Sequence, residues 1–122
     1  MAPIRGLSDL ERAAIRAALL LELRRTEEQV VSLARQFDDI VTAAEMSNID
    51  DEHDPEGTTI AFERAQVSAL HGQATRDAAA LQRTLADLDD DSFGACEECG
   101  GPIGFERLVA LPATRRCVEC AR

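Results

Sequence analysis

Residues 48–58, with the sequence NIDDEHDPEGT, separate two long stretches of helical periodicity in this chain of 122 residues. The segment is acidic, and it contains the helix breakers Pro55 and Gly57. Between Leu7 and this segment there is neither Pro nor Gly, and Ser8 and Glu11 form a capping-box pattern at the start. A helix of about 40 residues, about 60 Å long, is therefore predicted before the break.

Apolar residues recur every seven positions on both sides of the break, which is typical of helices that pack along a seam. The first stretch carries Leu23, Val30, Phe37 and Ala44, and the second carries Ile60, Val67, Ala74, Leu81 and Leu88, with Leu70, Ala78 and Leu85 between them. A further stripe near the N-terminus, Leu7, Leu10, Ala14, Ala17 and Leu21, is expected to be partly covered by Phe93, Ile103 and Phe105. Two such helices joined by a short turn predict an antiparallel coiled-coil hairpin within one chain. A dimeric coiled coil is the alternative.

Four cysteines follow the second stretch as two Cys-x2-Cys pairs: Cys96, Cys99, Cys117 and Cys120. Thiolates satisfy the tetrahedral preference of zinc, and seventeen residues between the pairs fall within the range of a four-cysteine site. Four protein ligands leave no position open for water, so one structural zinc ion is predicted. Gly100 and Gly101 are expected to let backbone amides turn toward the sulfurs. A redox motif or a disulfide framework fits less well, because no thioredoxin-like context and no secretory segment is visible.

The formal net charge is −10, and every basic residue is an arginine. This balance argues against direct binding to DNA and favours a protein partner with a basic surface, or solubility alone. The most apolar run, from Ala13 to Leu23, contains Arg16 and Glu22, so neither a membrane span nor a signal peptide is expected. No nucleophile–base pair is visible, so the chain is not expected to be an enzyme. We expect a cytoplasmic monomer.

The predicted architecture is mainly α, with a long hairpin and a small four-cysteine zinc-finger module at its base. Residues 1–91 would form an N-terminal segment and the hairpin, with the acidic turn at residues 48–58, and residues 92–122 would form the zinc module.

Residues 93–120 also resemble a known family closely, and the preceding hairpin matches that family in architecture. The motifs Phe93-Gly-Ala-Cys-Glu-Glu-Cys-Gly, Ile103-Gly-Phe-Glu-Arg-Leu, Leu111-Pro and Cys117-Val-Glu-Cys are similar to those of the DksA/TraR transcription regulators of bacteria. The acidic stretch at the turn resembles that of the actinobacterial members. The resemblance implies a protein that binds RNA polymerase directly, without binding DNA, and inserts the tip of its coiled coil into the secondary channel. Some members act together with the nucleotide ppGpp.

At the tip, the resemblance implies acidic residues that act on the polymerase. The candidates here are Asp50, Asp51, Glu52, Asp54 and Glu56. Two rival functions stay open on sequence grounds: an adaptor that combines a coiled coil with a zinc module and does not bind polymerase, and a zinc finger that binds DNA.

Overall fold

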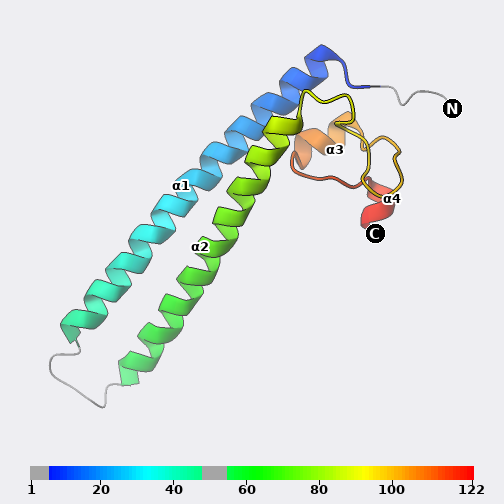
Figure 1. Ribbon diagram of the computed structural model, residues 1–122. Coiled ribbons are helices and arrows are strands. Elements are labelled where there is room, and N and C mark those ends of the chain that lie inside the picture. Colours follow the sequence, from blue (N-terminus) through cyan, green and yellow to red (C-terminus); the bar gives the residue numbers. More distant parts are fainter. Residues whose placement is uncertain (1–5, 48–54) are drawn as a thin grey trace. The chain divides into compact units, whose positions relative to one another are not determined.

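The computed structural model describes residues 6–47 and 55–122. It consists of the helices α1 (Asp9–Ser47), α2 (Pro55–Asp87), α3 (Phe105–Ala110) and α4 (Val118–Ala121), and α1 and α2 run antiparallel (Figure 1). In the described part of the chain, extended pairing is limited to an isolated bridge between Ala95 and Pro102. The predicted fold class, a mainly helical hairpin followed by a four-cysteine module, is confirmed.

The start of α1 is fixed by the capping box. The Ser8 amide donates to Glu11 Oε1 at 2.9 Å, and the Glu11 amide donates to Ser8 Oγ at 3.1 Å. Two backbone groups that lack partners within the helix are thereby satisfied. Asp9 and Glu11 also lie in the first turn, where negative charge interacts favourably with the helix dipole and stabilises the helix. The predicted start near Ser8 is confirmed.

The described chain forms two compact units: a middle unit, Arg25–Ala78, and a terminal unit, which joins Met1–Arg24 to Ala79–Arg122. This division runs through both long helices. The boundary predicted between residues 91 and 92 separates the hairpin from the zinc module instead, and it stays a prediction.

In the middle unit, α1 and α2 pack through Leu33, Val67 and Ala74, with three partly buried residues around them, Val30, Phe37 and Ile40. The seven-residue repeats are therefore confirmed as the seam here. One assignment was wrong: Leu70 is 49% exposed, whereas His71 is half-buried. The seam of α2 passes through position 71 because steps of four and three residues link Val67 to Ala74 through it.

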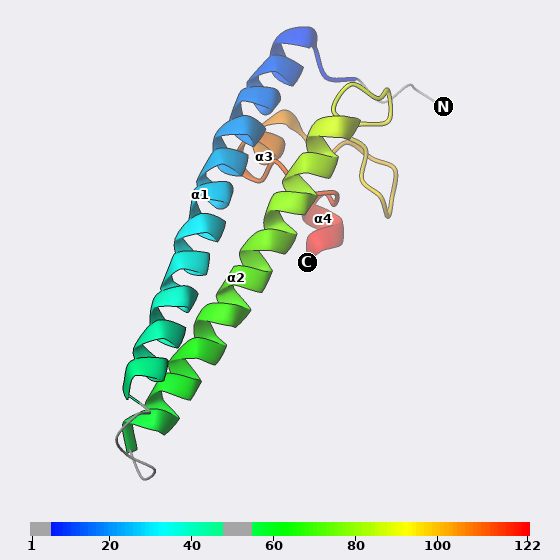
Figure 2. The same cartoon turned by 60° about the vertical axis from the view of Figure 1, so that its left-hand side comes forward.

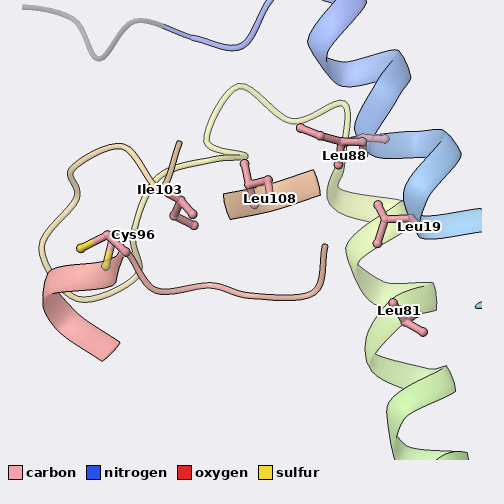
Figure 3. Packing of buried hydrophobic residues seen from close by; sticks show 8 residues of the cluster. Leu19, Leu81, Leu88, Cys96, Ile103 and Leu108 are labelled. Carbon is pink, nitrogen blue, oxygen red and sulfur yellow. The ribbon is translucent and has the colours of Figure 1, made fainter. Parts of the chain in front are cut away.

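The core of the terminal unit is built by both long helices together with the cysteine-containing segment. Its buried members are Ile15, Leu19, Leu81, Leu88, Cys96, Ile103, Leu108 and Cys117 (Figure 3). Figure 3 shows Ile103 and Leu108 between Cys96 and the leucines of the two helices. The metal-binding segment therefore shares a hydrophobic core with the ends of the hairpin.

The predicted N-terminal stripe was largely wrong. Ile15 and Leu19 are completely buried, whereas Leu10 is 85% exposed and Leu21 is 50% exposed. Leu7 alone of the predicted stripe lies against the core. The error arose because residues 13–21 are apolar on nearly every side of the helix, so periodicity could not select a face. The buried face contains Leu19, Thr26 and Leu33, which follow one another at seven-residue spacing. Because Thr26 is polar, a search for apolar residues alone did not find this repeat.

Two arginines of α1 bind residues 88–90, which directly follow α2. The Arg16 guanidinium lies 2.7 Å from Asp89, and Arg12 donates hydrogen bonds to the carbonyls of Leu88 and Asp90. Cationic donors are favourable at a helix C-terminus, where carbonyl groups lack partners within the helix. None of the described helices contains an apolar stretch of the length needed to cross a membrane.

Candidate metal centre

A tight backbone turn positions the first cysteine pair. The Gly100 amide donates to the Cys96 carbonyl at 2.9 Å, and the Cys96 amide donates to the Gly101 carbonyl at 2.7 Å. Gly100 has φ of 74°, a conformation that favours glycine, and the Gly101 amide points to the Cys99 sulfur at 3.4 Å. The expected turn of an amide toward a sulfur is confirmed for Gly101, whereas the Gly100 amide donates to the Cys96 carbonyl instead.

The second pair is positioned by α4. Cys117 is the residue that precedes the helix, and the Ala121 amide donates to its carbonyl at 3.0 Å, so one helical turn brings Cys120 back beside Cys117. A backbone hydrogen bond of 2.9 Å from the Glu97 amide to the Arg115 carbonyl joins the segments that carry the two pairs. The two motifs thus meet although seventeen residues separate them.

The four sulfur atoms all lie within 4.8 Å of one another. Cys99 and Cys117 are free thiols whose sulfurs are 3.8 Å apart. In a tetrahedral zinc site with Zn–S distances of about 2.3 Å, the sulfurs are about 3.8 Å apart. The donor set and its spacing therefore fit one zinc ion held by Cys96, Cys99, Cys117 and Cys120. Because all four ligands come from the protein, the ion has a structural role.

The thiols differ in environment. Cys96 and Cys117 are buried, Cys120 is half-buried and Cys99 is exposed. Hydrogen bonding from the backbone of Cys99, and then of Cys117, lowers the pKa of the Cys96 thiol to about 6. The neighbouring sulfur of Cys117, followed by those of Cys96 and Cys99, raises the pKa of Cys120. Cys96 is thus already a thiolate at neutral pH, whereas Cys120 must give up a proton when a metal ion binds.

Ion pairs around the centre are the main feature that sequence reasoning missed. Arg116 lies 3.4 Å from Glu97 and 3.1 Å from Glu98, the two residues between the first cysteines. Arg115 lies 2.9 Å from Asp87 at the end of α2, and the Arg107 side chain donates to the Arg116 carbonyl at 2.9 Å. Arg115 and Arg116 thus pair with carboxylates, and the adjacent acids Glu97 and Glu98 were the available signal.

The predicted tip residues are separate from this centre. Asp50, Asp51, Glu52 and Asp54 lie outside the described residues, and Glu56 belongs to the first turn of α2. The interpretation of these acids as a partner-binding tip stays a prediction.

Comparison with known proteins agrees with the geometry of the centre. Residues 91–122 match the family described as prokaryotic dksA/traR C4-type zinc finger. Over 40 residues, the chain is 42% identical to the RNA polymerase-binding transcription factor DksA of Escherichia coli (strain K12) and 45% identical to the protein of the same name from Haemophilus influenzae. The aligned segment covers 33% of this chain, but only 26% and 28% of these relatives.

The likeness of fold extends much further than the likeness of sequence. The structure of transcription factor DksA2 from Pseudomonas aeruginosa superimposes with a TM-score of 0.77, covering 93% of this chain and 82% of that one, at 18% identity. At this identity the comparison shows a shared fold: a long helical hairpin with a C-terminal module.

Proposed function

Since residues 91–122 are a zinc finger of the dksA/traR C4 type, we propose that this protein binds RNA polymerase directly and regulates transcription. The observation that carries the proposal is the combination of this finger with a long antiparallel hairpin. Relatives matched through the finger are named RNA polymerase-binding transcription factors, and DksA2 has the same fold along nearly the whole chain.

The hairpin would be the part that reaches into the polymerase. We propose that its turn, with Asp50, Asp51, Glu52, Asp54 and Glu56, enters the secondary channel. Arg25–Ala78, the middle unit, contains 12 of the 23 acidic residues and 4 of the 13 arginines, a net charge of 4 − 12 = −8 out of −10 for the chain. Negative charge concentrated in this way favours a positively charged docking groove. Carboxylates near a catalytic magnesium ion would alter the field around it.

The zinc module would serve as a fixed mount for the hairpin ends. Ile103 and Leu108 lie in one core with Leu19 and Leu88, so a folded module holds the two helices together. Metal binding contributes on the order of 10–16 kcal/mol in small zinc modules, enough to fold a segment with so small a core of its own. The protein would act by occupying and perturbing the polymerase, without catalysis of its own, as one cytoplasmic copy per enzyme.

Direct DNA binding is not part of this proposal. Arg115 and Arg116, which a DNA-binding finger would direct at phosphates, are paired with Asp87, Glu97 and Glu98. The overall charge opposes approach to nucleic acid as well.

The proposal is tested by separating binding from regulation. We expect the double substitution Asp51→Asn with Asp54→Asn to leave the affinity for polymerase about unchanged and to abolish the effect on transcription initiation. Asp38→Asn with Asp39→Asn is the matched control, because it removes the same charge from exposed positions of α1 in the middle unit. Competition binding to purified polymerase and run-off transcription are measured on the same preparations.

Three outcomes would contradict the proposal or part of it. Absence of binding by the unmodified, zinc-loaded protein would reject the polymerase as partner. Full regulation by the Asp51 and Asp54 variant would remove the tip from the mechanism. Equal loss of regulation in the control would show that total charge matters and that the position of the acids does not.

A further inference from the structure

Two acidic residues stand between the first two metal ligands. Glu97 and Glu98 occupy the positions between Cys96 and Cys99, and both side chains are about half exposed. A zinc ion held by four thiolates carries a net negative charge. Carboxylates beside such a centre raise its electrostatic energy, because like charges repel one another. The two acids therefore weaken the centre unless a nearby cation compensates them.

Arg116 supplies this cation from the segment that carries the second cysteine pair. It directly precedes Cys117 in the chain. Its Nε lies 3.4 Å from Glu97 Oε1, and its Nη2 lies 3.1 Å from Glu98 Oε1. One guanidinium thus contacts both acids, for which its planar fork of donors is better suited than an ammonium group. Figure 2 shows α4 beside the loop that carries the first pair, so this contact joins the two ligand segments.

The main chain of Arg116 is held in place by two further contacts. Its carbonyl accepts a hydrogen bond of 2.9 Å from Arg107 Nε of α3 and one of 3.3 Å from Thr114 Oγ1. On the same helix as Arg107, Leu108 is 1% exposed and belongs to the core of the terminal unit. The Arg116 side chain therefore extends from an anchored position, and less conformational entropy is lost when it reaches the acids.

We propose that Arg116 is a positioning residue of the metal centre: its pairing with Glu97 and Glu98 holds the two cysteine pairs together and strengthens the retention of zinc. Release of the ion requires the two pairs to separate, and the ion pairs break when they do. Cys99 is the exposed ligand and directly follows Glu98, so the contact lies next to the ligand that solvent reaches. This inference depends on the zinc centre and is independent of the proposed action on RNA polymerase.

The size of the effect follows from the exposure of the three side chains. Arg116 is 51% exposed, Glu97 is 53% exposed and Glu98 is 46% exposed. Ion pairs of this kind are individually weak, and dissolved salt screens them. Two such pairs that share one guanidinium are expected to change the affinity for zinc by roughly three- to tenfold.

The first test is competition for zinc between the full chain and an uncharged chelator, in reducing buffer at low and at high salt. Arg116→Gln should weaken zinc binding by roughly three- to tenfold at low salt and by clearly less at high salt. Arg122→Gln is the matched control, because it removes the same charge from an exposed side chain two residues after Cys120. The control should change the affinity by no more than about twofold.

A second comparison shows whether Arg116 acts through the acids. In a chain that already carries Glu97→Gln and Glu98→Gln, adding Arg116→Gln should change the zinc affinity by no more than about twofold. A purely structural role of Arg116 would give the same loss in both backgrounds. The proposal is overturned by an unchanged affinity in Arg116→Gln, by an equal loss in Arg122→Gln, by a loss that salt does not reduce, or by a full loss in the background without the two acids.

Discussion

Replacing Leu19 by Ala tests which face of α1 is buried in the terminal unit, and Leu20→Ala is its control. The two residues are adjacent on α1, yet Leu19 is completely buried and Leu20 is 51% exposed. The substitution at Leu19 removes three carbon atoms from a core shared with Leu81, Leu88 and Leu108. At about 0.8 kcal/mol per buried carbon, the transfer contribution is roughly 2.4 kcal/mol. The cavity left behind raises the expected loss to about 3–5 kcal/mol.

The control should lose at most about 1 kcal/mol, because half of its side chain is already in water and no closed cavity forms. Urea unfolding followed by circular dichroism, with zinc saturated and protein dilute, gives the free energy of unfolding of both variants. In thermal unfolding, Leu19→Ala should lower Tm by roughly 10–20 °C. Equal losses in the two variants, or a loss near zero at Leu19, would show that the buried face of α1 has been assigned wrongly.

Three further predictions concern the metal centre and the middle unit. Cys99→Ser should reduce bound zinc, measured by elemental analysis, to well below one ion per chain. It should also unfold residues 93–120, while most of the helical signal in circular dichroism remains. A full zinc content in this variant would contradict the ligand assignment. Zinc affinity should fall with pH throughout the range from 8 to 5, because Cys120 must release a proton when zinc binds, and it should fall more steeply below about 6, where Cys96 also becomes protonated. Chelator competition between pH 5 and 8 measures this, and an affinity independent of pH would contradict thiolate ligation. Phe37→Ala should cost less stability than Leu33→Ala, about 1–2 against about 3 kcal/mol in urea unfolding, because Phe37 is only half-buried whereas Leu33 is 6% exposed; the reverse order would place Phe37 in the centre of the seam.

The sequence predicted those features that depend on spacing. Regular seven-residue steps, with Pro55 and Gly57 as breakers, indicated two paired helices, and the buried Val67 and Ala74 lie where the repeat predicts. The cysteine spacing indicated the metal centre, because two residues between ligands allow one turn to supply both.

Features that depend on packing between distant segments were less accessible. The N-terminal part of α1 is apolar on several sides, so its periodicity does not show which side is buried. Ile15 and Leu19 are buried there because they pack against Leu88 and the cysteine-containing segment. Polar residues in the core obscured the pattern further. Thr84 is buried, and its hydroxyl donates to the Ala80 carbonyl at 2.9 Å, so the polar group keeps a hydrogen-bond partner in the core.

The division into a continuous middle unit and a discontinuous terminal unit has a consequence for synthesis on the ribosome. Arg25–Ala78 contains all the partners of its own core, so these residues can begin to pair as soon as they have emerged. Ile15 and Leu19 emerge earlier, but they must wait for Ile103, Leu108 and Cys117, about a hundred residues later. At typical rates of translation the delay is several seconds or more. During that interval the nascent chain exposes two unpartnered apolar faces of the same helix, and chaperones that bind apolar segments would recognise it then.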